Sequence, residues 1–151
     1  MDDFERLLQP AIKFLAIRAR SQKEVKDYLR KKTSDGNLIN QIIDKLTGMG
    51  LIDDRKFAQW LIESRSRSRP RGQRLLINEL KSKGINLDRD SLRIDEPALA
   101  QTALTPKLRL WLKLPYREFR VKAGRFLASR GFSWEVIEKV VKAVYNNPHV
   151  N

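Results

Sequence analysis

Apolar residues recur at every third or fourth position along most of the chain. Between residues 4 and 19, for example, Phe4, Leu8 and Ile12 begin one such series. This spacing is typical of an amphipathic α-helix that buries one face. The pattern predicts an almost wholly α-helical protein, with helices over residues 4–19, 22–32, 37–47, 54–66, 71–83, 107–113, 116–130 and 134–145.

Three segments share one plan of a leucine, a basic step and a break. They are DYLRKKTSDGNLINQIIDKL at 27–46, NELKSKGINLDRDSL at 78–92 and RFLASRGFSWEVIEKVV at 125–141. Their aligned leucines, Leu29, Leu80 and Leu127, are separated by 51 and 47 residues. A period of this size is typical of stacked helical units, each too small to bury its own apolar face.

This repeat predicts the domain organisation. We expect an all-α protein that forms an elongated and curved tandem array of three three-helix repeats. The repeats should occupy residues 1–50, 51–97 and 98–147, followed by a tail at 148–151. The three aligned leucines should all be buried, because each has the same place in its repeat.

Capping residues mark two helix starts. Ser21 and Glu24 have the spacing of a capping box, in which the serine oxygen accepts a backbone N–H and the glutamate bonds back to the cap. Asp53 or Asp54 should cap the helix that follows, because carboxylates favour the positive end of a helix. Catalysis by these two acids would need a partner and a pocket, and the sequence offers neither. We therefore interpret them as caps.

Prolines and glycines refine the helix limits. Pro70 is expected to open a helix at its favoured first position, with Gly72 leaving room for close packing. Pro106 is expected to interrupt a helix or delay its start, because proline lacks the N–H that a helix interior needs. Few apolar residues lie between Gly84 and Pro97, so the last helix of the second repeat should be short or irregular.

Net charge indicates the kind of partner. The chain holds 31 Lys and Arg against 18 Asp and Glu, giving +13 and a pI near 10.3. Such a surplus favours a polyanionic partner. Residues 60–84 carry a surplus of 5 positive charges and residues 107–130 a surplus of 7, so these two stretches supply nearly all of it.

Several protein classes are excluded by composition. The chain has no cysteine, and its one histidine, His149, belongs to the predicted tail. It also has no phosphate-binding glycine loop, no cluster of metal ligands and no nucleophile–base pair, so we expect neither an enzyme nor a cofactor. The acidic start, MDDFERLLQP, does not have a signal-peptide pattern, and no apolar run could span a membrane. We therefore expect a soluble, cytoplasmic protein.

Four segments carry a more specific pattern: AIKFLAIRARSQKEVKDYLRKK, LTGMGLIDDRKFAQWLIESR, RGQRLLINELKSKGI and FLASRGFSWEVIEKVV. The positions that define it are Arg18, Ser21, Leu29, Asp53, Asp54, Phe57, Ala58, Gly72, Leu80, Gly84, Leu127, Gly131 and Phe132. In these positions the chain resembles the regulatory protein RecX family of bacteria, over roughly residues 10 to 145.

The resemblance implies a function as well as an all-helical, three-repeat fold. It implies a protein that binds the RecA recombinase filament on DNA and inhibits its ATPase, strand-exchange and co-protease activity. Such a protein takes part in homologous recombination, DNA repair and the SOS response. It would act as a monomer, lie along the filament groove and contact single-stranded or double-stranded DNA.

The two basic stretches supply the candidate partner-binding residues. These are Arg65, Arg67, Arg69, Arg71, Arg74, Lys107, Arg109, Lys113, Arg117, Arg120, Lys122 and Arg125. An alternative is a general helical DNA-binding protein that acts through phosphate contacts. A scaffold for protein partners alone would leave the positive charge unexplained.

Overall fold

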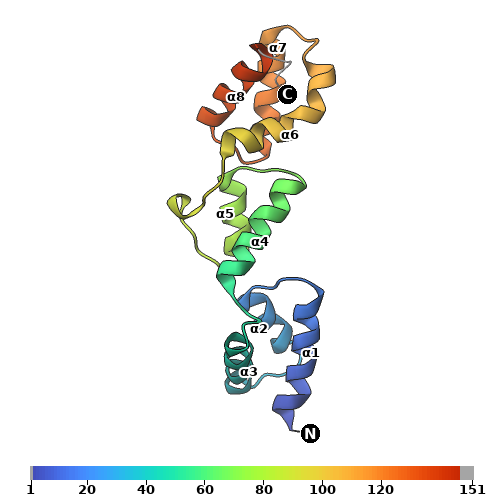
Figure 1. Cartoon of the computed structure of the whole chain (residues 1–151), viewed down its shortest axis with the longest axis vertical. Helices are drawn as coiled ribbons and strands as arrows, with labels where there is room; N and C mark the ends of the chain where they lie inside the picture. Colours follow the sequence, from blue (N-terminus) through green and yellow to red (C-terminus); the bar gives the residue numbers. More distant parts are fainter. Residues whose placement is uncertain (1, 147–151) are drawn as a thin grey trace. The chain divides into compact units, whose positions relative to one another are not determined.

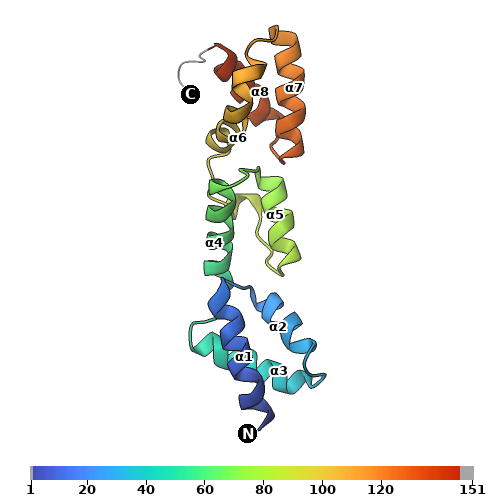
Figure 2. The ribbon, with the colours of Figure 1, turned by 90° about the vertical axis from the view of Figure 1, so that its right-hand side faces the viewer.

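The structure is a computed structural model that describes residues 2–146, and all its regular elements are helical (Figures 1 and 2). They are α1 (Asp3–Ile17), α2 (Gln22–Arg30), α3 (Gly36–Gly48), α4 (Asp54–Arg67), α5 (Gln73–Ser82), the 3-10 helix η1 (Arg89–Ser91), α6 (Glu96–Trp111), α7 (Tyr116–Ser129) and α8 (Trp134–Asn146). The all-α prediction is confirmed. The predicted tail at 148–151, with His149, lies outside the described residues.

The chain divides into two compact units, and the division runs through α4 and α5. Unit 1 takes the described residues up to Leu61 together with Leu80–Asn86. Unit 2 takes Ile62–Glu79 and the described residues from Leu87 onward.

Each unit holds a core of the predicted amphipathic stripes. In unit 1, the buried faces of α1, α2 and α3 meet around Leu29 and Leu46, neither of which is exposed. In unit 2, α6, α7 and α8 meet around Phe119 and Leu127, which are also fully buried (Figure 1). Leu80 is buried as well. The expected burial of the three aligned leucines is confirmed.

The predicted caps form, and the two aspartates Asp53 and Asp54 cap different helices. Glu24 N–H donates to Ser21 Oγ at 3.2 Å and Ser21 N–H donates to Glu24 Oε1 at 3.1 Å, which completes the capping box. Asp53 Oδ1 accepts two backbone N–H groups in the first turn of α4. Asp54 instead accepts the N–H of Gln22, at the start of α2.

The start of α6 differs from the prediction. The helix begins at Glu96 rather than 107, because Asp95 caps it by accepting the N–H of Ala98 at 3.1 Å and Pro97 lies in the first turn, where no N–H is needed. Pro106 is inside the helix and exposed. Buried apolar side chains on both sides of it offset the roughly 3 kcal/mol cost of an interior proline.

Of the two other predictions for the segment between α4 and α6, one is wrong and one is confirmed. Pro70 does not open a helix: α5 begins at Gln73, and Gly72 stands at its cap position with its carbonyl accepting the N–H of Leu76. The third helix of the second repeat is reduced to η1, so its prediction as short or irregular is confirmed.

An equivalent hydrogen bond occurs once in each unit. In unit 1, Asp54 in the first turn of α4 accepts the N–H of Gln22 at 2.8 Å. In unit 2, Glu96 in the first turn of α6 accepts the N–H of Gln73, at the start of α5, at 3.2 Å. Gln22 and Gln73 are 51 residues apart, like the first two aligned leucines. The sequence repeat thus produces a repeated joint, in which an acid at one helix start caps an earlier helix.

Glycines allow the neighbouring helices to approach each other closely at these two joints. Gly84 and Gly131 follow α5 and α7 with φ values of 80° and 87°, a region that favours glycine. A Cβ at Gly84 would lie 2.9 Å from the Cβ of Lys23 in α2. A Cβ at Gly131 would clash with Leu75 in α5, and one at Gly72 would clash with the Gly131 backbone.

Truncating Leu80 to alanine should lower the free energy of unfolding by roughly 2–5 kcal/mol, because the side chain is fully buried. Urea denaturation followed by circular dichroism measures this loss. Leu110→Ala is the matched control, since Leu110 is 67% exposed. Equal midpoints for the two variants would show that the repeat alignment does not place Leu80 in a core.

Gly131→Ala should destabilise the protein by roughly 2 kcal/mol or more, since a left-handed alanine costs about 1–2 kcal/mol and its Cβ must also displace Leu75. Gly48→Ala is the control, because Gly48 ends α3 with open space around it. That variant should keep or slightly raise the stability. Thermal unfolding of both variants tests the joint, and a Gly131→Ala protein as stable as Gly48→Ala would contradict it.

Candidate nucleic-acid interface

Glu79 on α5 gathers two arginines at the end of α4 and in the following loop. Arg65 directs its Nε and a terminal nitrogen at the carboxylate, with Nε 3.0 and 3.1 Å from the two oxygens. Arg71 binds the same carboxylate at 3.1 Å. The Nε of Arg71 also donates to the carbonyl of Arg69 at 3.2 Å. Both paired side chains are therefore fixed in position and partly withdrawn from solvent.

The charges around Glu79 shift the arginine pKa values in opposite directions. Hydrogen bonding to Glu79 raises the pKa of Arg65. Burial lowers the pKa of Arg71, and the positive charges of Arg65, Arg69 and Arg130 add to this effect against the attraction of Glu79. Arg130, at the end of α7, therefore belongs to the same group of charges.

Arg69 has an unusual backbone conformation. Its φ of 63° lies in the left-handed region that residues other than glycine seldom adopt. Its side chain is exposed, and its carbonyl accepts from Arg71. The turn thus helps to orient one arginine while it presents another to solvent.

Two aromatic rings extend this group of charges along α6 and α7. The guanidinium of Arg130 lies 4.9 Å from the centre of the Phe126 ring, which meets Trp111 edge to face at 5.9 Å. The Lys107 amine lies 5.9 Å from Trp111 and 5.6 Å from Phe126. The Lys122 amine lies 5.9 Å from Trp111. We call this set the basic–aromatic surface: Arg69, Arg71, Lys107, Trp111, Lys122, Phe126 and Arg130.

Much of the positive charge on the basic–aromatic surface is not neutralised. In residues 2–146, no carboxylate forms an ion pair with Lys107, Lys122 or Arg130. Cations beside part-buried aromatic rings are the combination that binds single-stranded nucleic acid, where amines meet phosphates and rings stack with bases. The surface can therefore bind a polyanion.

The twelve predicted partner-binding residues have different surroundings. Arg65 is held by Glu79, and Arg74 donates to the carbonyl of Ala128 at 3.2 Å. Arg120 pairs with Glu138 at 3.0 Å. Because Arg120 and Lys122 are two residues apart on α7, they project about 200° apart around it. The remaining predicted residues outside the basic–aromatic surface are exposed: Arg67, Arg109, Lys113, Arg117 and Arg125.

Three members of the basic–aromatic surface were not predicted: Trp111, Phe126 and Arg130. The sequence carries a signal for them, because each pairs with a basic or aromatic residue four positions away. The pairs are Lys107 with Trp111, Lys122 with Phe126, and Phe126 with Arg130. Side chains at this spacing are neighbours on a helix.

The residues of the family pattern lie in cores, caps and joints. Arg18 pairs with Glu24 at 2.7 Å and lies 5.5 Å from the Trp60 ring. Gly84 is exposed at its joint and Asp53 is exposed at its cap. The buried members are Ser21, Leu29, Phe57, Ala58, Gly72, Leu80, Leu127, Gly131 and Phe132.

No helix within residues 2–146 is both long and apolar enough to cross a membrane. The same residues contain no group of three acidic or histidine side chains that could hold a metal ion.

Family models and known proteins agree on one likeness. The first, second and third three-helix domains of RecX match residues 9–46, 53–88 and 95–141. The regulatory protein RecX of Pelodictyon phaeoclathratiforme is 33% identical, over 87% of this chain and 84% of its own length. That of Bacillus velezensis is 31% identical over 93% of this chain, which spans only 56% of that longer relative.

A solved structure shares the fold. The crystal structure of RecX from Lactobacillus salivarius aligns with a TM-score of 0.83 and 24% identity, covering 95% of this chain and 97% of the other. At this identity the match concerns the fold alone. Because the three RecX domains match most of the sequence and a named relative is 33% identical, the chain belongs to the RecX family of regulatory proteins.

Proposed function

We propose that this chain binds the RecA recombinase filament on DNA and inhibits its ATPase, strand-exchange and co-protease activity. The basic–aromatic surface is the observation that supports this proposal. It places the amines of Lys107 and Lys122 and the guanidinium of Arg130 around two aromatic rings, and within residues 2–146 no carboxylate pairs with them. A nucleoprotein filament offers phosphates for these cations and bases for the rings.

The proposed inhibition works by binding. The described residues have no metal-holding group, and the basic–aromatic surface has no acid–base pair suited to catalysis. A chain that lies on the filament can hold neighbouring protomers in one arrangement and so slow steps that require them to move. For this, the chain must bind one state of the filament more tightly than the other, and it needs no catalytic step.

A general DNA-binding function is the second candidate, and the spacing of amines and rings favours it. The pairs on α6 and α7 suit single-stranded nucleic acid with or without a recombinase. Binding through phosphates alone weakens steeply with salt, whereas protein contacts keep part of the affinity. Comparing bare single-stranded DNA with the filament at raised salt separates the two functions.

Reversing three exposed cations of the basic–aromatic surface should strongly weaken inhibition. The variant Arg69→Glu, Lys107→Glu, Lys122→Glu changes the net charge from +13 to +7, because each reversal removes two charges. It spares Arg71, where a glutamate would face Glu79. The measurement is RecA ATPase on single-stranded DNA with each protein titrated in. Wild type should inhibit, and the variant should need at least about tenfold more protein, the effect of roughly 1.4 kcal/mol.

A matched control has the same net charge. Lys13→Glu, Lys31→Glu, Lys45→Glu reverses three exposed lysines of unit 1. It should inhibit like wild type if the location of the charge matters. No inhibition by wild type would reject the proposed function. Equal inhibition by all three proteins would place the binding surface elsewhere.

Removing two amines should also change the salt dependence of DNA binding. Lys107→Gln with Lys122→Gln should reduce the slope of log affinity against log salt by about 1.4 for single-stranded DNA, since each phosphate contact contributes about 0.7. Fluorescence anisotropy with a labelled oligonucleotide at several salt concentrations measures the slope. Lys13→Gln with Lys45→Gln serves as the control. An unchanged slope in the first variant would show that these amines do not contact phosphates.

A further inference from the structure

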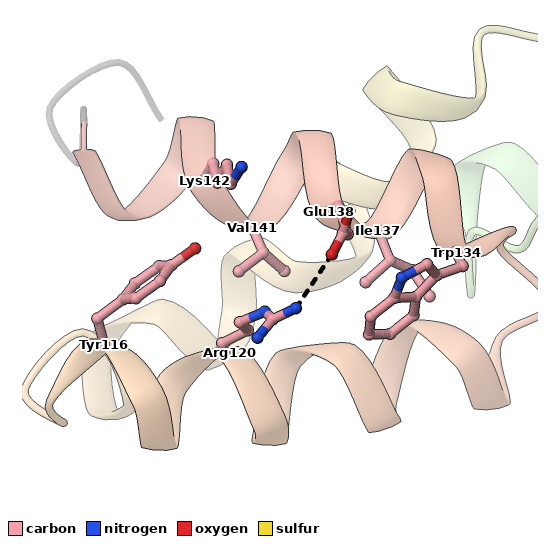
Figure 3. A pocket seen from close by; sticks show the side chains of 7 residues that line it. All are labelled: Tyr116, Arg120, Trp134, Ile137, Glu138, Val141 and Lys142. Atoms are coloured by element: carbon pink, nitrogen blue, oxygen red, sulfur yellow. Dashed lines mark hydrogen bonds and ion pairs between the residues drawn. The ribbon is translucent and has the colours of Figure 1, made fainter.

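The flank of α7 opposite the Lys122 side carries a second group of residues. Arg120 lies on this flank, and Figure 3 shows it between Tyr116 and Trp134, beside the facing helix α8. Glu138 and Lys142 follow along α8. We call Tyr116, Arg120, Trp134, Glu138 and Lys142 the Trp134 strip. All of it belongs to unit 2.

Trp134 is held in an exposed position. Its side chain is 58% exposed, although tryptophan is one of the largest apolar side chains. A Cβ at Gly124 would lie 3.8 Å from Cζ3 of the ring, an ordinary contact distance, so the ring packs beside α7 at this residue. Val121, one turn earlier on the same face of α7, is 46% exposed. Unit 2 therefore leaves two large apolar side chains exposed here, one from each of the facing helices α7 and α8.

The size of the hollow in the strip excludes a small-molecule ligand. The residues of the strip, with Ile137 and Val141, enclose only about 10 Å³. Pockets for small molecules typically have roughly 300–1,000 Å³. A flat macromolecular contact suits this surface better than an enclosed ligand.

Charge and composition favour a protein over a nucleic acid. Arg120 pairs with Glu138 at 3.0 Å, so the strip is partly neutralised, unlike Lys122 on the other flank of α7. Arg120 also lies 5.9 Å from the Trp134 ring. Trp, Tyr and Arg are the residues most enriched in the hot spots of protein interfaces. All three occur here within two turns of α7 and the start of α8.

We propose that the Trp134 strip is a protein-contact hot spot that takes an apolar protein surface bearing a carboxylate. Trp134 and Val121 cover the apolar part. Arg120 uses one terminal nitrogen on Glu138, and its other donors, with the exposed Lys142 amine, meet the carboxylate. This inference rests on the proposed function: the basic–aromatic surface binds the DNA of the filament, and the opposite flank of α7 binds its protein.

The test compares two ligands, a labelled single-stranded oligonucleotide and the RecA filament assembled on it with a non-hydrolysable ATP analogue. Trp134→Ala should weaken filament binding by about tenfold or more, as hot-spot truncations do, and should leave the affinity for the bare oligonucleotide within about twofold. Ile17→Ala is the matched control, since Ile17 is an exposed apolar residue of unit 1 at 77% exposure. It should bind both ligands like wild type.

A second variant separates a loss of binding from a loss of folding. Arg120→Glu with Glu138→Arg exchanges the pair and keeps both the ion pair and the net charge of +13. It should melt close to wild type and still lose filament affinity, because a glutamate on α7 then faces the partner carboxylate.

The outcomes separate this inference from the proposed function. If wild type fails to bind the filament, both are overturned. If wild type binds and both strip variants bind equally well, only the protein-contact role is overturned. If Trp134→Ala weakens the filament and the bare oligonucleotide by the same factor, the strip is a nucleic-acid surface and the inference is wrong.

Discussion

The joint at the start of α5 is the contact on which the basic–aromatic surface of unit 2 depends. Gly72 donates its N–H to the carbonyl of Arg130 at 2.8 Å, and its Cα approaches so closely that no side chain would fit beside Gly131. This approach brings the end of α7 to the loop that holds Arg69 and Arg71. Arg130 is 59 residues from Arg71 in sequence and still adds its charge to the same group. The repeat packing therefore determines where the cations gather.

Gathering like charges costs free energy, and Glu79 offsets part of it. One carboxylate accepts hydrogen bonds from both Arg65 and Arg71, which are 30% and 22% exposed. Charge-assisted bonds of this kind are stronger than neutral ones and fix the guanidinium planes. Arg65 and Arg71 thus hold the loop, whereas Lys107 and Lys122 have no carboxylate partner among the described residues. The count of basic residues could predict a polyanion partner, but it could not separate these two roles.

The sequence predicted the fold better than the site. Periodic apolar residues predict every α-helix except residues 96–106 of α6, where the interior Pro106 argues against a helix that the Asp95 cap and the buried stripe past it support. Burial of many side chains outweighs one lost backbone bond, and only the packed structure shows that balance. A count of charged residues along the sequence does not identify Phe126 and Arg130. These residues stand out only when residues four positions apart are compared, because such residues are neighbours on a helix.

On the proposed function, the geometry of α7 would let a regulator without catalytic groups select an assembly over its components. A helix turns 100° per residue, so Arg120 and Lys122 face opposite ways although they are close in sequence. On the proposed arrangement, one flank meets phosphates and the other meets protein. Either contact alone is weak, because a few cations or one small apolar area contribute little after the entropy of association. When one rigid helix makes both, the second contact is intramolecular, and affinity rises about 10²- to 10⁴-fold. Only DNA covered by protein offers both surfaces at the right spacing, so the filament would be bound in preference to bare DNA or free recombinase.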